Sequence, residues 1–160
     1  MDYKLLESNG VENENVDGAA FNNIAVGGES GVILGVLNGC SVSFSGSLVT
    51  VNTGELIISG FRVKITSPYT VSRGASASDT SHHIFARIYL KEDRSVTFSM
   101  GCREVSPLTQ DSLFVNEKGT YEIEIASFKT NASGIYDLKK TVGFVSGGGS
   151  SLPSAEEASF

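Results

Sequence analysis

Residues 61–65, FRVKI, carry the clearest structural signal in the chain. Three apolar residues, Phe61, Val63 and Ile65, alternate there with two basic ones. Because successive side chains of a β-strand point to opposite faces of its sheet, this alternation predicts a strand with one buried and one exposed face. The stretch therefore indicates a sheet that packs one side against a core.

Shorter segments of the same kind precede this strand. An apolar run at 31–37 ends at Asn38-Gly39, a dipeptide that strongly favours a tight turn. Glycine-containing turns separate three further strand-like segments, at 42–44, 48–51 and 55–59. Short strands joined by tight turns predict an antiparallel meander.

Longer strands are predicted after residue 66. Residues 67–81 are polar and rich in glycine and serine, so we expect a loop with at most one short strand. HIFARIYL, residues 83–90, is apolar on nearly every residue except Arg87, which predicts a strand in the centre of a sheet. A charged turn at 91–94 leads to its hairpin partner at 95–100.

The remaining strands follow a connection. We expect residues 107–119 to form this connection and to contain a short helical turn. TYEIEIASFK, residues 120–129, alternates well and predicts a strand. We expect residues 131–134 to form the next turn and residues 135–145 to form the last strand.

The fold class that follows is all-β: an antiparallel β-sandwich or meander over residues 31–145. Residues 1–30 predict an extended, turn-rich N-terminal arm, in which GAAFNNIAVG (18–27) is compatible with one or two helical turns. The arm buries too little apolar surface to fold alone, so we expect it to pack on something else. Residues 146–160 predict a flexible Gly/Ser-rich tail, and its terminal Phe160 is a candidate anchor for a partner's pocket.

The net charge of −6 is concentrated at the two ends of the 160-residue chain. Residues 1–30 hold six acids and one base, and residues 146–160 hold two acids, whereas residues 31–145 hold eleven bases and ten acids. A nearly neutral body offers no basic stripe for phosphates, which argues against nucleic-acid binding. We interpret the acidic ends as solvated segments, with docking onto a neighbouring protein as the alternative.

Composition excludes several further classes. No apolar run is long enough for a transmembrane helix, and the start MDYKLLESNG lacks the features of a secretory signal. Two cysteines are too few for a disulfide scaffold, and no CxxC pair offers a zinc site. Eighteen glycines and twenty-three serines make up about a quarter of the chain, which fits short strands joined by turns.

Histidine and cysteine give weak candidate sites. His82 and His83 are adjacent on a predicted strand and so point to opposite faces, which disfavours a metal site shared with Asp79. Cys40 and Cys102 have no basic cluster or histidine beside them, so neither is expected to be a nucleophile. We interpret both as small buried hydrophobic side chains.

Glu122 and Glu124 share one face of a predicted strand, about 7 Å apart. That spacing alone resembles the carboxylate pair of glycosidases. Alternate acids on an exposed sheet face are common, however, so we expect both side chains to be solvated. Lys139 and Lys140 are candidate cross-strand charge partners for this face.

Two glycine-rich loops and one sequon complete the search. GGES (27–30) and SGGGS (146–150) lack the following amphipathic helix that a phosphate-binding loop needs. Asn131-Ala132-Ser133 matches an N-glycosylation sequon, which carries little weight without a secretory signal. We therefore expect no catalytic residue, no cofactor and no metal ion.

The order of these features resembles a module of tailed-phage virion proteins, found in baseplate and fibre proteins of phages and prophages of Gram-positive and gut bacteria. An Asp-x-x-x-Phe-Asn stretch precedes a strand ending in Asn-Gly. A V-x-V-x-x-G-x-x-x-x-x-G element, an apolar strand with a central arginine, a charged turn and a YEI-I-A phrase follow. The matching residues are Asp17, Phe21, Asn22, Asn38, Gly39, Val49, Val51, Gly54, Gly60, Arg87 and the segment Tyr121 to Ala126. The resemblance covers residues 17–145.

The resemblance implies a β-sandwich-like shoulder domain, often trimeric, that is fixed to other tail or baseplate proteins in a virion assembled in the bacterial cytoplasm. In larger relatives the module is followed by stems and receptor-binding heads, whereas here a Gly/Ser tail follows it. We therefore expect an adaptor, cap or attachment piece, acting through protein–protein contacts, rather than an enzyme.

The alternative function is a carbohydrate-binding β-sandwich whose partner is a glycan on the host surface. Sugar sites favour exposed aromatic side chains, and the tyrosines are the main candidates: Tyr3, Tyr69, Tyr89, Tyr121 and Tyr136. Loss of glycan binding in Tyr69→Ala would favour this alternative. A small hydrolase is a third hypothesis, which requires acids and histidines gathered in one cleft.

Overall fold

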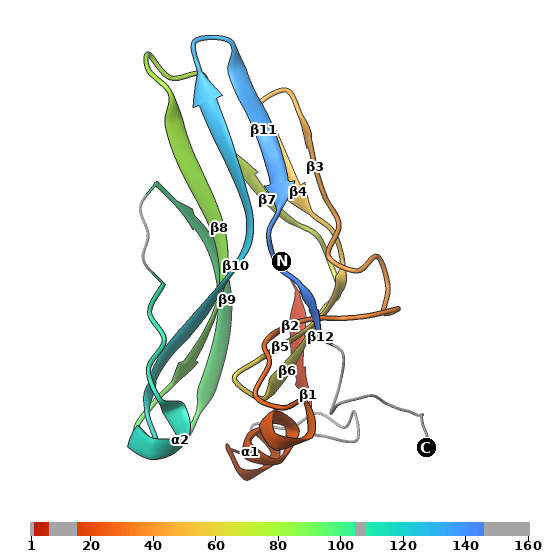
Figure 1. Cartoon of the computed structure of the whole chain (residues 1–160), viewed down its shortest axis with the longest axis vertical. Helices are drawn as coiled ribbons and strands as arrows, with labels where there is room; N and C mark the ends of the chain where they lie inside the picture. Colours follow the sequence, from red (N-terminus) through yellow and green to blue (C-terminus); the bar gives the residue numbers. More distant parts are fainter. Residues whose placement is uncertain (1, 7–15, 105–107, 146–160) are drawn as a thin grey trace.

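The computed structural model describes residues 2–6, 16–104 and 108–145 (Figure 1). Strands dominate these residues, so the predicted all-β class is confirmed. The five-stranded sheet has the order β1 (Tyr3–Leu6), β6 (Phe61–Ile65), β5 (Gly54–Ile58), β2 (Gly31–Ile33) and β12 (Phe144–Val145). The four-stranded sheet has the order β11 (Gly134–Lys140), β10 (Gly119–Asn131), β8 (Thr80–Leu90) and β9 (Val96–Arg103). The three-stranded sheet has the order β3 (Val42–Ser45), β4 (Leu48–Val51) and β7 (Tyr69–Ser72).

The sheets enclose one hydrophobic core in a sandwich-like arrangement. Alternate residues of β8, from Ile84 to Leu90, are fully buried on the inner face of the four-stranded sheet. They share the core with Val63 and Ile65 of β6 and with Val49 of β4, which come from the other two sheets. Figure 1 shows β8, β9 and β10 on one side and β3 to β6 on the other. The alternation predicted at 61–65 and the central position predicted for 83–90 are both confirmed.

Two ordered elements lie in the segment predicted as an extended, turn-rich arm. Strand β1 pairs antiparallel with β6, with Tyr3 opposite Ile65. Helix α1 (Val16–Ala25) packs on the same strand, and Ala19 is buried there. A Cβ at Gly60 would lie 2.0 Å from the Ala19 carbonyl oxygen, so the lack of a side chain lets the helix approach. The prediction of a turn-rich arm is therefore wrong for β1, whereas α1 matches the helical turns that the sequence allowed at 18–27; residues 7–15 lie outside the described residues.

The predicted meander is divided between two sheets. The hairpin β3–β4 belongs to the three-stranded sheet and the hairpin β5–β6 to the five-stranded sheet. The switch occurs at Asn52–Thr53, where the Thr53 carbonyl accepts hydrogen bonds from the backbone N–H groups of Asn38 and Cys40. Gly54 begins β5 against Cys40, whose Sγ would lie 2.5 Å from any Cβ at that position. A residue with no side chain thus lets the chain leave one sheet and enter the next.

The last predicted strand, 135–145, is also divided. Strand β11 ends at Lys140, and the backbone N–H groups of Thr141 and Val142 both donate to the Ile125 carbonyl. The chain then forms β12, which pairs parallel with β2 in the other layer. Gly31 lies so close to Gly143 that a Cβ there would be 2.5 Å from the Gly143 carbonyl oxygen. Tight backbone contact, which alternation cannot predict, therefore moves this segment between sheets.

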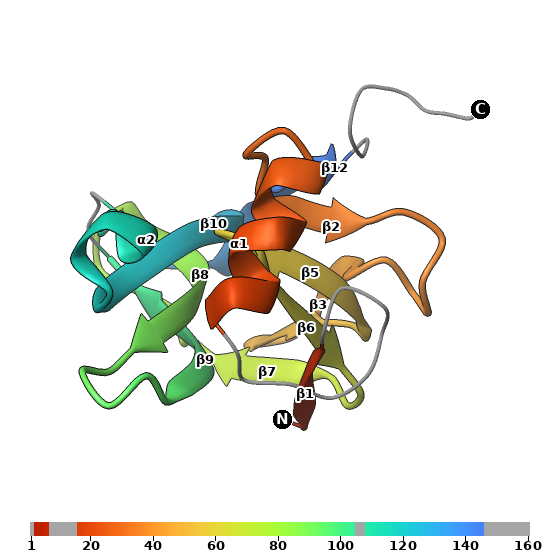
Figure 2. The same ribbon diagram turned by 90° about the horizontal axis from the view of Figure 1, so that it is seen from below.

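The shorter predicted connections are confirmed. Strand β7 is the short strand expected within 67–81, and the turn at 91–94 is closed by a hydrogen bond from the Lys91 backbone N–H to the Ser95 carbonyl. Helix α2 (Leu113–Asn116) is the helical turn expected within 107–119. Figures 1 and 2 place α2 at the same end of the molecule as α1. The predicted tail, including Phe160, lies outside the described residues.

Candidate functional site

The outer face of the four-stranded sheet carries a group of hydrogen-bonded polar side chains from three strands. The strand register arranges them in rows across β9, β8 and β10. The rows are Thr97–Tyr89–Thr120, then Ser99–Arg87–Glu122, then Gly101–Phe85–Glu124. Successive rows lie about 7 Å apart along the strands. The face therefore presents two aromatic rings, one arginine, two carboxylates and several hydroxyl groups at fixed spacing.

Glu122 is the centre of this face, and only 1% of its surface is exposed. Arg87 Nε donates to Glu122 Oε2 at 2.9 Å, and Arg103 Nη2 donates to Oε1 at 2.6 Å. The backbone N–H of Thr109 donates to Oε1 at 2.9 Å. Arg103 ends β9 and Thr109 begins the return to β10, so one carboxylate holds both sides of the β9–β10 connection.

The hydrogen bonds that Glu122 accepts keep its carboxyl group ionised. Burial alone would raise the pKa of this carboxyl. The hydrogen bonds from Arg103, from the Thr109 backbone and from Arg87 outweigh burial and lower the pKa from 4.5 to about 2. A carboxyl with that pKa is ionised at neutral pH and has no proton to donate as a general acid.

Phe85 supports the two arginines from below. Its ring lies over Gly101, and a Cβ at that glycine would be 2.6 Å from the Phe85 Cζ. The guanidinium carbons of Arg87 and Arg103 lie 4.8 Å and 4.3 Å from the ring centroid. Cation–π contacts at this distance hold the guanidinium planes in place. The absence of a side chain at Gly101 thus allows the stack that orients both arginines toward Glu122.

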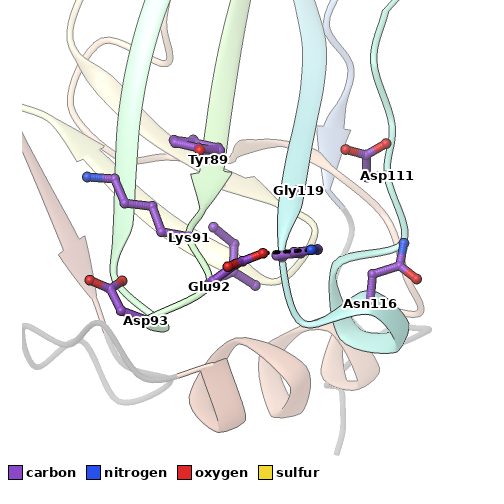
Figure 3. Close-up of a pocket in the computed structure, with 9 residues that line it drawn as sticks. Tyr89, Lys91, Glu92, Asp93, Asp111, Asn116 and Gly119 are labelled. Atoms are coloured by element: carbon purple, nitrogen blue, oxygen red, sulfur yellow. Dashed lines mark hydrogen bonds and ion pairs between the residues drawn. The ribbon is translucent and has the colours of Figure 1, made fainter.

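Two hollows flank Tyr89 on this face, and together we call them the Tyr89 groove. The smaller hollow, of about 420 Å³, is lined by Arg87, Ser99, Glu122 and the threonines beside Tyr89. The larger, of about 850 Å³, extends to the turn after β8 and to α2 (Figure 3). Tyr89 lines both hollows and is 45% exposed.

The far end of the Tyr89 groove also has fixed polar groups. Lys118 Nζ donates to Glu92 Oε2 at 2.7 Å, the contact drawn as a dashed line in Figure 3. The hydrogen bond from Lys118 lowers the pKa of Glu92, and the same contact raises the pKa of Lys118. Asp111 Oδ2 accepts a hydrogen bond from the backbone N–H of Thr120 at 2.8 Å. The groove can therefore offer a ligand hydrogen-bond donors and acceptors as well as side chains of both charges.

The expected solvated face at Glu122 and Glu124 is wrong for Glu122. Glu124 is half-buried, and its Oε1 lies 2.7 Å from His83 Nδ1. Neither lysine expected as a partner pairs with these acids: Lys139 lies beside Asp137, and Lys140 donates to the Gly39 carbonyl. The partners of Glu122 come instead from the neighbouring strands and from the β9–β10 connection. The resemblance to a glycosidase carboxylate pair does not extend to the structure, because two arginines hold the Glu122 carboxylate in ion pairs.

The two histidines lie on opposite faces of β8, as predicted. His82 is buried on the inner face, where its ring stacks on Phe128 and Nε2 lies 2.9 Å from Thr130 Oγ1. His83 is on the outer face with Glu124. Within the described ranges, no three His, Cys, Asp or Glu side chains form a group that could hold a metal ion.

The cysteines are free thiols. Cys40 is fully buried, and burial raises its pKa to about 11 although Lys140 acts in the opposite direction. This confirms the interpretation of Cys40 as a buried hydrophobic side chain. Cys102 is only half-buried, and burial again raises its pKa. Neither thiol has the lowered pKa of an activated nucleophile.

The remaining sequence candidates separate clearly by position. Tyr69 is half-buried against the core. Tyr89, on the outer face of the four-stranded sheet, is the more exposed of these two tyrosines. Gly27 and Gly28 of GGES follow α1 and have positive φ angles. Asn131 ends β10 and Ala132 and Ser133 form the turn to β11, where Asn131 Oδ1 accepts a hydrogen bond from the Ser133 backbone N–H. The loop SGGGS lies outside the described residues.

Comparison with protein-family models, with curated proteins and with solved structures found no match. Among the described residues, no helix is long and apolar enough to span a membrane.

Proposed function

We propose that this chain is a structural protein of a tailed-phage particle, a tail, baseplate or fibre adaptor that acts through protein–protein contacts. The order of motifs over residues 17–145 supports the proposal through the virion module that it resembles. The structural observation that carries it is an exposed apolar surface at the edge of the five-stranded sheet. Such a chain holds partners together instead of converting a substrate.

The edge patch consists of Leu34, Leu37 and Phe144, which are 69%, 56% and 54% exposed. Phe144 belongs to β12, and the two leucines follow β2, its neighbour. Lys140 links Phe144 to the turn that follows the two leucines, because its Nζ lies 4.9 Å from the Phe144 ring centroid and donates to the Gly39 carbonyl at 2.6 Å. Large apolar side chains exposed together mark protein–protein contacts.

The occupant that we assign to the edge patch is a second copy of the chain in a trimer. A closed ring of identical chains needs two different surfaces on each chain, which contact each other between neighbours. The β3–β4 hairpin supplies exposed apolar side chains for the second surface: Phe44 is 45% exposed on one face of the hairpin, and Leu48 is 42% exposed on the other. Two separate apolar surfaces on one rigid core suit a ring better than a two-fold dimer, which uses one surface.

Light scattering coupled to size-exclusion chromatography tests this proposal. We expect the purified chain to elute as a trimer, and Phe144→Ser combined with Leu34→Ser to produce monomers. Val115→Ser is the matched control, because Val115 is 79% exposed but lies on α2, away from both surfaces. A wild-type chain that is monomeric, and that mass spectrometry never detects in phage particles, would refute the proposal.

A further inference from the structure

The Tyr89 groove has features of a ligand-binding site, and it lies on a part of the molecule that the edge patch does not include. Tyr89 stands at the middle of its row, with Thr97 on one side and Thr120 on the other. An exposed aromatic ring beside hydroxyl groups offers a flat apolar surface and hydrogen bonds together. This combination suits a pyranose ring, which has an apolar C–H face and a rim of hydroxyl groups.

Arg87 adds a charged group at a defined distance from that ring. It lies in the next row along β8, about 7 Å from Tyr89. Its contact with Glu122 uses Nε and Nη2 and not Nη1. The charged side chains that line this end of the groove are Arg87, Arg103 and Glu122, so arginines outnumber carboxylates there.

The arginine is also held in place before any ligand arrives. Glu122 fixes the guanidinium from one side and the Phe85 ring supports it from below. A group that is already oriented loses less conformational entropy on binding, so its contact with an anion contributes more to affinity. The positive end of the groove is therefore suited to a carboxylate attached to a sugar ring.

We propose that the Tyr89 groove binds an acidic saccharide, with a sugar ring stacked on Tyr89 and a sugar carboxylate paired with Arg87. The larger hollow holds the neighbouring sugar units, where Asp111, Asn116 and Lys118 meet their hydroxyl groups (Figure 3). This assignment moves the carbohydrate hypothesis from Tyr69 to Tyr89. It is independent of the proposed role in a particle, because groove and edge patch belong to different sheets.

An NMR titration of the full chain with a trimer of galacturonic acid tests the proposal. The fully methyl-esterified trimer is the matched ligand, since it keeps the sugar rings and removes the negative charge. We expect saturable shifts of the Thr97 and Thr120 amide signals with the acid, and binding about tenfold weaker with the ester. Tyr89→Ala is expected to weaken binding of the acid by about tenfold or more.

The control variant is Ile24→Ala. Ile24 is 80% exposed, but it lies on helix α1, outside the Tyr89 groove. Unchanged binding by Ile24→Ala, with the losses expected above, supports the groove. No binding of the acid at about 10 mM, equal binding of acid and ester, or full binding by Tyr89→Ala would each overturn the proposal. Binding of a triglutamate peptide as tightly as the saccharide would also overturn it, in favour of an acidic peptide.

Discussion

Glu122 and His82 lie on neighbouring strands of one sheet, and both are buried, but on opposite faces of it. On the outer face, Glu122 receives hydrogen bonds from two arginines and a backbone N–H. On the inner face, His82 contacts Thr130 through Nε2, and its Nδ1 has no hydrogen-bond partner among the described residues. The sheet therefore stabilises a charged side chain on one face and a neutral one on the other.

The physical reason for this difference is the source of the partners. The outer face receives Arg103 and Thr109 from the β9–β10 connection, which brings charge and a free backbone donor to the carboxylate. The inner face is filled by apolar side chains, such as Phe128 stacked on the His82 ring. Desolvation there opposes an imidazolium, and accordingly burial lowers the pKa of His82.

The largest expected effect comes from removing the charge of Glu122. Glu122→Gln leaves Arg87 and Arg103 facing each other without their counter-charge, so we expect the free energy of unfolding to fall by about 3 kcal/mol. Urea unfolding at pH 7 measures it. Glu124→Gln is the control, because Glu124 is two residues away on β10 but half-exposed, and its expected cost is below about 1 kcal/mol. Equal losses in the two variants would contradict a special role for Glu122.

The second largest effect is expected at Gly101, under the outer-face cluster. Gly101→Ala places a Cβ 2.6 Å from the Phe85 ring, which must move and take the two guanidinium groups with it. We expect a loss of about 2 kcal/mol, the usual cost of overpacking a filled site. Gly74→Ala is the matched control, since a Cβ there meets no atom within 4 Å. A neutral Gly101→Ala would show that Phe85 does not support the arginines.

These two faces also show what local sequence can predict. The strands at 61–65 and 83–90 were predictable because alternation and apolar runs are local properties of the chain. Strand β1 was not, because Tyr3 pairs with Ile65, sixty-two residues further along the chain, and four residues carry little pattern. Acids at alternate positions give the same sequence pattern whether their face is exposed or is covered by arginines from other strands. The burial of Glu122 therefore depended on distant residues.

One signal did point to this site. Arg87 interrupts an apolar strand that was predicted to be central, and a central arginine requires a carboxylate on an adjacent strand. Glu122, in the other long alternating segment, is the residue that meets it. The same register places Tyr89 on the outer face, two residues along from Arg87. An arginine in a central strand therefore indicates a carboxylate partner on the neighbouring strand, which alternation alone does not indicate.

The smallest expected effect, and the finest test of the comparison, is the response of the two faces to acid. A carboxyl whose pKa is lowered on folding contributes stability above its unfolded value, and loses it as the pH falls through the folded value. For Glu122 this window runs from 4.5 down to about 2. A histidine whose pKa is lowered on folding also costs stability as the pH falls, because the unfolded chain binds the proton first. For His82 that loss begins near its ordinary value of 6.5, before Glu122 responds.

His82→Leu separates the two windows. Leucine removes both the titration and the unpaired Nδ1, while Thr130 Oγ1 keeps its contact with Ser76 at 2.8 Å. We expect the urea midpoint of this variant to stay level from pH 7 to about pH 5, where the wild-type midpoint declines, and to fall with the wild type below pH 4.5. Ser81→Ala, the exposed neighbour on β8, should retain the wild-type profile. If His82→Leu declines as steeply as the wild type above pH 5, the inner face does not hold a neutral histidine, and only the outer face responds to charge.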